Sequence, residues 1–196
     1  MRVVSLLGSP RPKGNSTVIA SHFASCAEKH GAEVTAFALN TLDYNGCQGC
    51  LACKTKLDTC IVEDDLSEIL DAVRACDVLV LSSPVYFGDV SGQLKCFIDR
   101  TFSFLTPDYA TSEQKTRLDH GKTLVFIVTQ GHPDETEFAD VFPRYEPFFR
   151  LMGFDQSHLI RACGVYSLGV AKRRQDILSL AERTAAAVTG SGSGSS

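Results

Sequence analysis

The sequence lacks any block of like charges and any long hydrophobic run. Its 196 residues include 19 Lys and Arg against 23 Asp and Glu, a formal net charge of −4. Because neither sign is concentrated, the charge pattern points to neither nucleic acid nor an anionic membrane surface. No apolar run approaches a membrane span, and the chain opens without the basic and apolar regions of an export signal. We therefore expect a cytoplasmic protein that binds neither nucleic acid nor membrane.

What the sequence does contain is enough apolar material for one core. Hydrophobic residues make up 44% of the chain, which suits a single compact domain. We expect this domain to cover residues 1–189. Residues 190–196 read Gly-Ser-Gly-Ser-Gly-Ser-Ser, a low-complexity run that predicts a flexible tail of artificial origin.

Apolar periodicity predicts five strands that alternate with five helices. Strands are expected at residues 3–7, 33–39, 78–81, 123–128 and 158–162. Helices are expected at about 16–30, from 64 onward, 91–102, 136–152 and 170–188, with a flexible polar connection at 106–121. This α/β alternation predicts a doubly wound, flavodoxin-like parallel sheet of order 2-1-3-4-5. Its ligand site is expected where strands 1 and 3 diverge.

The loop at residues 8–17 joins the first strand to the first helix. Backbone N–H groups at a helix start have no intrahelical partner, which suits a phosphate. The candidate phosphate-binding residues are Ser9, Arg11, Lys13, Asn15, Ser16 and Thr17. An ordinary helix start capped by Asn15 or Ser16 is the alternative, but the two cations in the loop favour the phosphate site. The spacing matches neither a dinucleotide fingerprint nor an ATP P-loop.

Two stretches resemble the NADPH-dependent FMN reductase family. The first loop resembles that family's G-S-x-R-x-x-(x)-N-S/T phosphate loop. Residues 82–86 and 91–100 resemble its S-P-V-Y…S-G-x-L-K-x-F-I-D-R pattern. The resemblance implies that the phosphate is that of FMN. Lys95, Asp99 and Arg100 of the second pattern are expected to be charges on a helix surface or an interface rather than catalytic groups.

If the first loop binds the phosphate, the loops after strands 3 and 4 are expected to hold the flavin ring. In residues 84–88, Pro84 and Val85 lead into the flat surfaces of Tyr86 and Phe87, and Gly88 permits close backbone approach. Backbone N–H groups of this loop are expected to reach the flavin edge. The alternative is that the two aromatic side chains only pack on the core. Thr129, Gly131 and the less diagnostic His132 occupy the loop after strand 4.

Four cysteines fall in a loop between strand 2 and the next helix. Cys47, Cys50, Cys53 and Cys60 have the spacing C-x2-C-x2-C-x6-C, which allows their thiolates to converge on one cluster. Zinc is less favoured because structural zinc usually takes two separated pairs. A reversible disulfide or idle thiols are a further alternative.

The cysteine spacing also resembles the compact motif of iron–sulfur flavoproteins, a branch of the same family. This resemblance implies that the four cysteines bind a [4Fe-4S] cluster. Family members without a demonstrated cluster keep a similar loop ending in C-x-x-x-D-D, which residues 60–65 also have.

The family resemblance implies an FMN-dependent oxidoreductase. It would pass electrons from a ferredoxin-like or NAD(P)H donor through [4Fe-4S] and FMN to a quinone or oxygen species. It further implies a homodimer or homotetramer in which the cluster of one subunit approaches the FMN of its neighbour. We expect no catalytic side chain, because the chemistry belongs to the cofactors. The alternatives are a cluster-free NAD(P)H:FMN or quinone reductase and a flavodoxin-like electron carrier.

Overall fold

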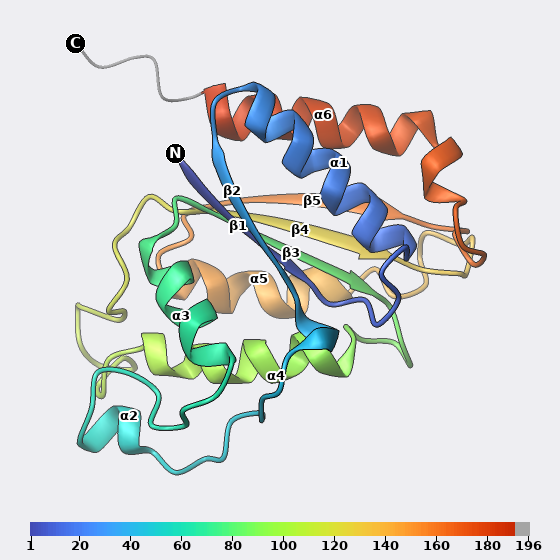
Figure 1. Ribbon diagram of the computed structural model, residues 1–196. Coiled ribbons are helices and arrows are strands. Elements are labelled where there is room, and N and C mark those ends of the chain that lie inside the picture. Colours follow the sequence, from blue (N-terminus) through green and yellow to red (C-terminus); the bar gives the residue numbers. More distant parts are fainter. Residues whose placement is uncertain (191–196) are drawn as a thin grey trace.

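A five-stranded parallel sheet lies at the centre of the computed structural model, which describes residues 1–190 (Figure 1). The strands are β1 Arg2–Leu7, β2 Glu33–Ala38, β3 Val78–Pro84, β4 Thr123–Thr129 and β5 Gln156–Ala162. Their order, β2-β1-β3-β4-β5, confirms the predicted order and fold class. Since β1 pairs with both β2 and β3, the winding direction changes at the carboxyl end of β1.

Helices cover both faces of the sheet. One face carries α1 Asn15–Lys29 and α6 Gln175–Gly190 (Figure 1). The other carries α3 Leu66–Ala75, α4 Gly92–Arg100 and α5 Val141–Leu151. Each face has its own apolar core: Phe23 packs with Val80 on the first, and Phe97 with Phe126 on the second. Strand β4 is buried at every position, as a central strand covered on both faces must be.

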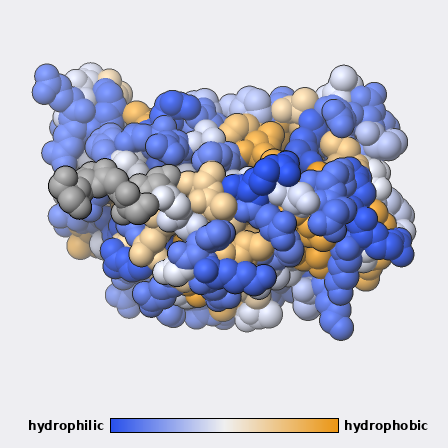
Figure 2. Space-filling model, turned by 90° about the horizontal axis from the view of Figure 1, so that it is seen from above, coloured by the Kyte–Doolittle hydropathy of each residue, from blue (hydrophilic) through white to orange (hydrophobic). Residues whose placement is uncertain are grey.

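Polar residues dominate the outside of the α1 and α6 layer. Figure 2 looks down on this side and shows a mainly hydrophilic surface interrupted by small apolar patches. Within residues 1–190, none of the helices combines the length and apolar character needed to cross a bilayer.

Several predicted boundaries differ from the structure. Helix α5 begins at Val141 and not near residue 136, because Phe138 has a left-handed φ of 60° that interrupts the helix. The predicted closing helix is divided into a 3₁₀ helix, Ala171–Arg173, and α6. Helix α6 includes Gly190, where the predicted tail begins; residues 191–196 of that tail lie outside the described residues. The 106–121 connection is more than a polar surface loop, since Thr116 and Leu118 are buried.

The cysteine loop follows β2 and lies against the C-terminal end of α4. It contains the short helix α2 Ala52–Thr55 and passes beneath α3 and α4 in Figure 1. The loop after β3, by contrast, leads into the N-terminus of α4. Helix α4 therefore separates two regions in which the sequence predicts chemistry.

Candidate functional site

A cavity of about 570 Å³ opens at the carboxyl ends of the strands, at the predicted place. Its volume lies within the range of small-molecule and cofactor sites. Nine predicted residues line it: Ser9, Arg11, Asn15, Ser16, Pro84, Val85, Tyr86, Thr129 and Gly131. His132 lines it as well. The structure thus brings the three predicted loops together around one space.

Four predicted residues lie outside the cavity lining that the described chain forms. Lys13 and Thr17 line a separate depression beside α1. Phe87 and Gly88 form the tip of the loop after β3, where the Phe87 side chain is fully exposed. These four residues could contact a ligand in the cavity through their backbone, through a side chain that extends toward the cavity, or from a second copy of the chain.

Helix α1 begins without a side-chain cap. Its N-cap is Gly14, with extended backbone, and no side chain of the described residues accepts a hydrogen bond there as a cap. A capping Asn15 or Ser16, the alternative to a phosphate site, is therefore not found. A Cβ on Gly14 would lie 2.5 Å from the Ser9 hydroxyl oxygen, so only glycine fits this close turn. The N-terminus of α1 lies at the cavity, since Asn15 and Ser16 line it. The unpaired N–H groups of this first helical turn favour an anion.

Asn15 has a structural role that the sequence does not reveal. Its amide nitrogen donates to the carbonyls of Val165, at 2.8 Å, and Ser167, at 3.0 Å. Its amide oxygen accepts from the N–H of Ala171 at 3.1 Å. The side chain therefore fastens the segment after β5 to the first loop, and its amide is not a free donor for a phosphate.

Ser16 is the first-turn residue with a free hydroxyl. Its oxygen is buried and has no hydrogen-bond partner among residues 1–190. The Thr17 hydroxyl, by comparison, donates to the Arg11 carbonyl at 3.5 Å. A buried hydroxyl without a partner is uncommon in folded proteins. At the wall of a cavity and at a helix N-terminus, it fits a phosphate oxygen.

The segment after β5 adds a wall that the sequence reasoning missed. Val165, Tyr166 and Leu168 line the cavity, and Tyr166 is 84% exposed. A Cβ on Gly131 would approach a Tyr166 ring carbon to 2.9 Å, so the glycine lets that ring lie against the loop after β4. The rule that parallel sheets bind ligands at their carboxyl edge would have indicated this segment, because it follows directly from β5.

The turn after β3 is held in place by the protein itself. The Val85 N–H donates to the Thr129 carbonyl at 2.8 Å, and the Tyr86 N–H donates to the Asp89 carbonyl at 2.8 Å. These two groups are therefore not free for a flavin edge. Phe87 and Gly88, with φ of 49° and 80°, are consecutive left-handed residues, as in a type I′ turn.

The four loop cysteines line one small pocket of about 40 Å³ beneath α4. All eight cysteines lie in the described part of the chain and are free thiols. Among the described residues, no three of these four sulfur atoms lie within 4.8 Å of one another. Tetrahedral zinc would hold its sulfur ligands about 3.8 Å apart, so the loop is not shaped around a single zinc ion. Thiolates are the usual ligands of iron–sulfur clusters, but the described residues do not form a clear cluster site here.

Two cationic side chains flank this pocket. Arg100 lines it, with its side chain completely buried, and interacts electrostatically with the Cys60 thiol. Lys54 donates to the carbonyls of Phe102 and Leu105, both at 2.6 Å. Burial lowers the pKa of Lys54, while the neighbouring Cys53 and Cys47 sulfurs act in the opposite direction. The pocket is therefore flanked by two basic side chains, of which Arg100 is also paired with Asp64 at 2.8 Å.

Comparison with known proteins shows which proteins this chain resembles. The family model described as NADPH-dependent FMN reductase matches residues 1–139. The chain is 40% identical over 101 residues to an iron–sulfur flavoprotein of Methanocaldococcus jannaschii, a match that covers 52% of each. It is 36% identical over 135 residues to an iron–sulfur flavoprotein of Archaeoglobus fulgidus, covering 69% of this chain and 58% of that protein. The chain thus spans little more than half the length of these curated relatives.

A solved structure is similar over nearly the whole fold. The NAD(P)H:quinone oxidoreductase from Methanothermobacter marburgensis superposes with a TM-score of 0.74 at 20% identity. The match covers 94% of this chain and 95% of that chain. At this identity the likeness establishes the shared fold, a parallel sheet with flanking helices.

Proposed function

The chain belongs to the NADPH-dependent FMN reductase family, and from this premise we propose that it is an FMN-dependent oxidoreductase. It oxidises NAD(P)H or a ferredoxin-like donor and reduces a quinone or an oxygen species. The observation that carries the proposal is the buried, unpartnered Ser16 hydroxyl at an uncapped helix start, within a cavity of about 570 Å³.

The chain's residues fit the two ends of FMN. Ser16 and the first-turn N–H groups of α1 bind the phosphate, and Arg11 and Lys13 add positive charge. Ser9 joins them when its hydroxyl turns away from the Arg11 carbonyl, to which it donates at 3.3 Å. Asn15 and Thr17 keep this cradle in shape through the protein hydrogen bonds described above. When bound, FMN supplies both hydride and single-electron chemistry.

The loops at the far side of the cavity orient the ring. Tyr86 and Tyr166 offer aromatic surfaces from opposite loops, and Pro84, Val85, Thr129 and Gly131 complete the walls. The backbone at Phe87 and Gly88, unlike that of Val85 and Tyr86, is available to donate to the ring edge.

We further propose that Cys47, Cys50, Cys53 and Cys60 hold a [4Fe-4S] cluster, which supplies single-electron transfer when present. The shared pocket and the cationic Arg100 and Lys54 support this assignment, as do the names of the two archaeal relatives. The cluster-free reductase is a second candidate. It is favoured by the fact that protein hydrogen bonds alone hold both ends of the loop.

A second copy of the chain completes the proposal. The cysteine pocket and the cavity lie at opposite ends of α4, whose nine residues span about 13 Å. Phe87, Tyr166 and Leu168 expose apolar side chains at the cavity rim, and water-exposed groups of this kind favour a protein contact. We propose a homodimer or homotetramer in which the neighbouring subunit covers this rim.

The deciding experiment is the absorption spectrum of protein purified without oxygen and supplied with iron, before and after reduction. Flavin bands together with a reducible sulfur-to-iron shoulder support both cofactors. Cys53→Ser should remove the shoulder and keep the flavin bands. The matched control, Cys163→Ser, changes a half-buried cysteine outside the loop and should keep both.

The other outcomes separate the candidates. Flavin bands alone would overturn the cluster and leave a simple reductase. Failure to bind added FMN would overturn the whole proposal. Steady turnover with NAD(P)H and a quinone would distinguish the reductase from a flavodoxin-like electron carrier.

A further inference from the structure

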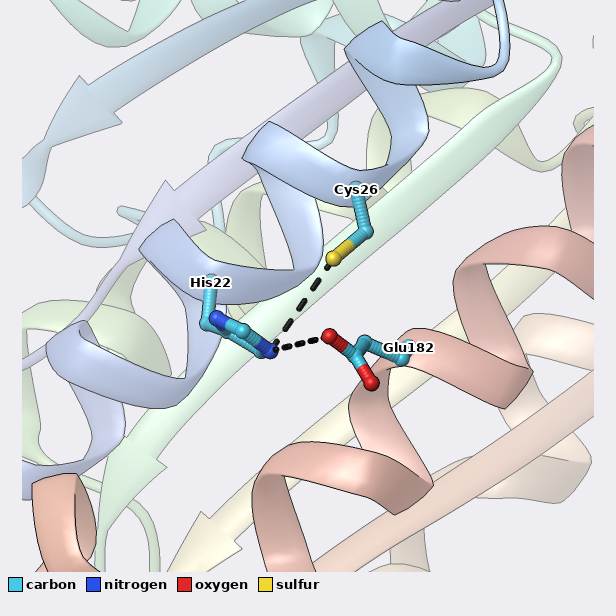
Figure 3. A group of neighbouring side chains, drawn as sticks. All are labelled: His22, Cys26 and Glu182. Atoms are coloured by element: carbon cyan, nitrogen blue, oxygen red, sulfur yellow. Dashed lines mark hydrogen bonds and ion pairs between the residues drawn. The ribbon is translucent and has the colours of Figure 1, made fainter. Parts of the chain in front are cut away.

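Three side chains of the types that ligate metals meet between helices α1 and α6 (Figure 3). His22 and Cys26 lie four residues apart on α1, so their side chains share one face of the helix. Glu182 reaches them from α6. In Figure 3 all three side chains point toward a common centre. This group belongs neither to the cavity nor to the cysteine loop.

The spacing of the three side chains matches that around a tetrahedral ion. The His22 Nε2 atom lies 3.4 Å from Glu182 Oε1 and 3.9 Å from the Cys26 sulfur. All three potential ligand atoms lie within 4.8 Å of one another. Usual zinc–ligand bond lengths in tetrahedral geometry place nitrogen about 3.4 Å from oxygen and about 3.6 Å from sulfur. The nitrogen-to-oxygen distance therefore already fits such an ion, and binding requires the thiol to move closer.

The surroundings of the three ligands allow a cation to enter. The Cys26 residue is only 6% exposed, whereas the side chains of His22 and Glu182 are 31% and 51% exposed. An ion can thus approach from solvent on the imidazole and carboxylate side and bind the thiolate at the bottom. Three protein ligands leave a fourth position for water.

The Cys26 thiol is a weak hydrogen-bond partner for the His22 imidazole, with 3.9 Å between sulfur and nitrogen. A divalent cation bound between them takes the place of the thiol proton and offsets the Glu182 carboxylate charge, as metals do when they bind protonated ligands.

We propose that His22, Cys26 and Glu182 form a binding site for a zinc-class divalent cation that links α1 to α6. Imidazole, thiolate and carboxylate are the three ligand types that zinc uses in proteins. The link has a structural consequence. Helix α1 starts at the proposed phosphate site, and α6 follows the segment that Asn15 fastens to it, so the cation stabilises the layer behind the cavity.

The test uses the full chain with its four loop cysteines replaced by serine and FMN supplied, titrated with Co²⁺ as the probe. We expect one equivalent to bind with a thiolate-to-cobalt charge-transfer band and tetrahedral visible bands, both displaced by Zn²⁺. Cys26→Ser should abolish the charge-transfer band. His22→Gln and Glu182→Gln should weaken binding by at least about tenfold, since even loss of a supporting partner has an effect of this size.

The matched control is the His120–Asp155 pair. It has a similar nitrogen-to-oxygen distance of 3.3 Å, but within residues 1–190 no third metal-ligating side chain completes a group with it. His120→Gln should therefore leave both the affinity and the spectrum unchanged. A spectrum without a thiolate band, or a band that survives Cys26→Ser and His22→Gln, would overturn the proposal.

Thermal unfolding of the full chain, with its four loop cysteines unchanged, provides an independent measurement. Zn²⁺ should raise the melting temperature, because a ligand bound only by the folded state stabilises it. The part of this rise that comes from the helix site should be lost in His22→Gln and retained in His120→Gln. Equal rises in both variants would contradict a site between α1 and α6. Neither result depends on the flavin or cluster assignment.

Discussion

The Arg100 guanidinium, with its side chain completely buried, lies 2.8 Å from the Asp64 carboxylate. The same guanidinium donates to the carbonyls of Asn45, at 2.9 Å, and Val62, at 2.8 Å. Asp64 in turn accepts from the Asn45 N–H at 3.0 Å. One side chain at the end of α4 therefore joins the segments that precede and follow the cysteine loop. The loop keeps its two ends together without help from a metal.

Removing this cation should strongly destabilise the fold. Arg100→Met keeps the apolar length of the side chain but leaves Asp64 as a buried charge without its partner. We expect the free energy of unfolding to fall by about 3–5 kcal/mol, measured by urea denaturation. The exposed Lys95–Asp99 pair, at 2.6 Å, is the control: Lys95→Met should cost less than about 1 kcal/mol. Equal losses in the two variants would contradict the role given to Arg100.

Asp64 should also make stability depend on pH. Burial by itself raises the pKa of this carboxyl, but the hydrogen bonds from Arg100, Asn45 and Leu66 prevail and lower it. A carboxyl whose folded pKa is depressed adds stability above its unfolded pKa, and this is lost as the pH falls through the folded value. We therefore expect urea midpoints of the natural chain to decline on acidification below about pH 4. Asp64→Asn should be less stable at neutral pH and show a shallower decline; an unchanged slope would contradict this linkage.

Ser16 offers a test of the phosphate site that is separate from folding. Its hydroxyl is buried without a partner in the described chain, so Ser16→Ala should leave the stability of the FMN-free protein unchanged or slightly higher. FMN affinity should fall by about tenfold or more, since a hydrogen bond to a charged group contributes about 1.5–3 kcal/mol. Fluorescence titration with FMN measures the change.

Ser5 provides the matched control for that titration. Its hydroxyl is also buried and unpartnered within residues 1–190, but it lies inside β1, away from the cavity lining. Ser5→Ala should leave FMN affinity unaltered. If the two variants bind FMN equally well, the Ser16 hydroxyl does not contact the phosphate.

The sequence predicts the fold and most of the cavity because both follow from local patterns. Apolar runs such as residues 78–81 identify central strands, and strand ends identify loops that share one edge of the sheet. Long-range side-chain contacts leave no such pattern. The partners of the Asn15 side chain, for example, lie about 150 residues further along the chain. The expectation that Arg100 lies at a surface or an interface is wrong, since its side chain is completely buried. The sequence does not reveal this burial, because the partners of Arg100 come from a loop without periodicity.

Asn15 should therefore matter for stability as well as for binding. Asn15→Ala removes two donated bonds and one accepted bond, which join the first loop to the segment 165–171. We expect a loss of about 2–4 kcal/mol, because buried carbonyls and an N–H lose their partners. The control is Asn40, whose side chain makes an exposed bond with Gln93 at 3.0 Å. Asn40→Ala should change stability by less than about 0.5 kcal/mol; a similarly small effect of Asn15→Ala would contradict the fastening role.

Phe87 combines an unfavourable backbone with a side chain that makes little contact within the subunit. Its φ of 49° lies in the left-handed region, and its side chain is fully exposed. Phe87→Gly should therefore maintain or raise the stability of the monomer, since left-handed backbone costs a non-glycine residue about 1–2 kcal/mol. A natural chain that keeps an aromatic residue here at that cost fits a contact with the neighbouring subunit. Phe87→Gly should accordingly shift sedimentation toward the monomer, and Phe87→Asn, which also tolerates this backbone, should do the same. Unchanged association together with unchanged stability in both variants would show that the ring has no role in the proposed interface.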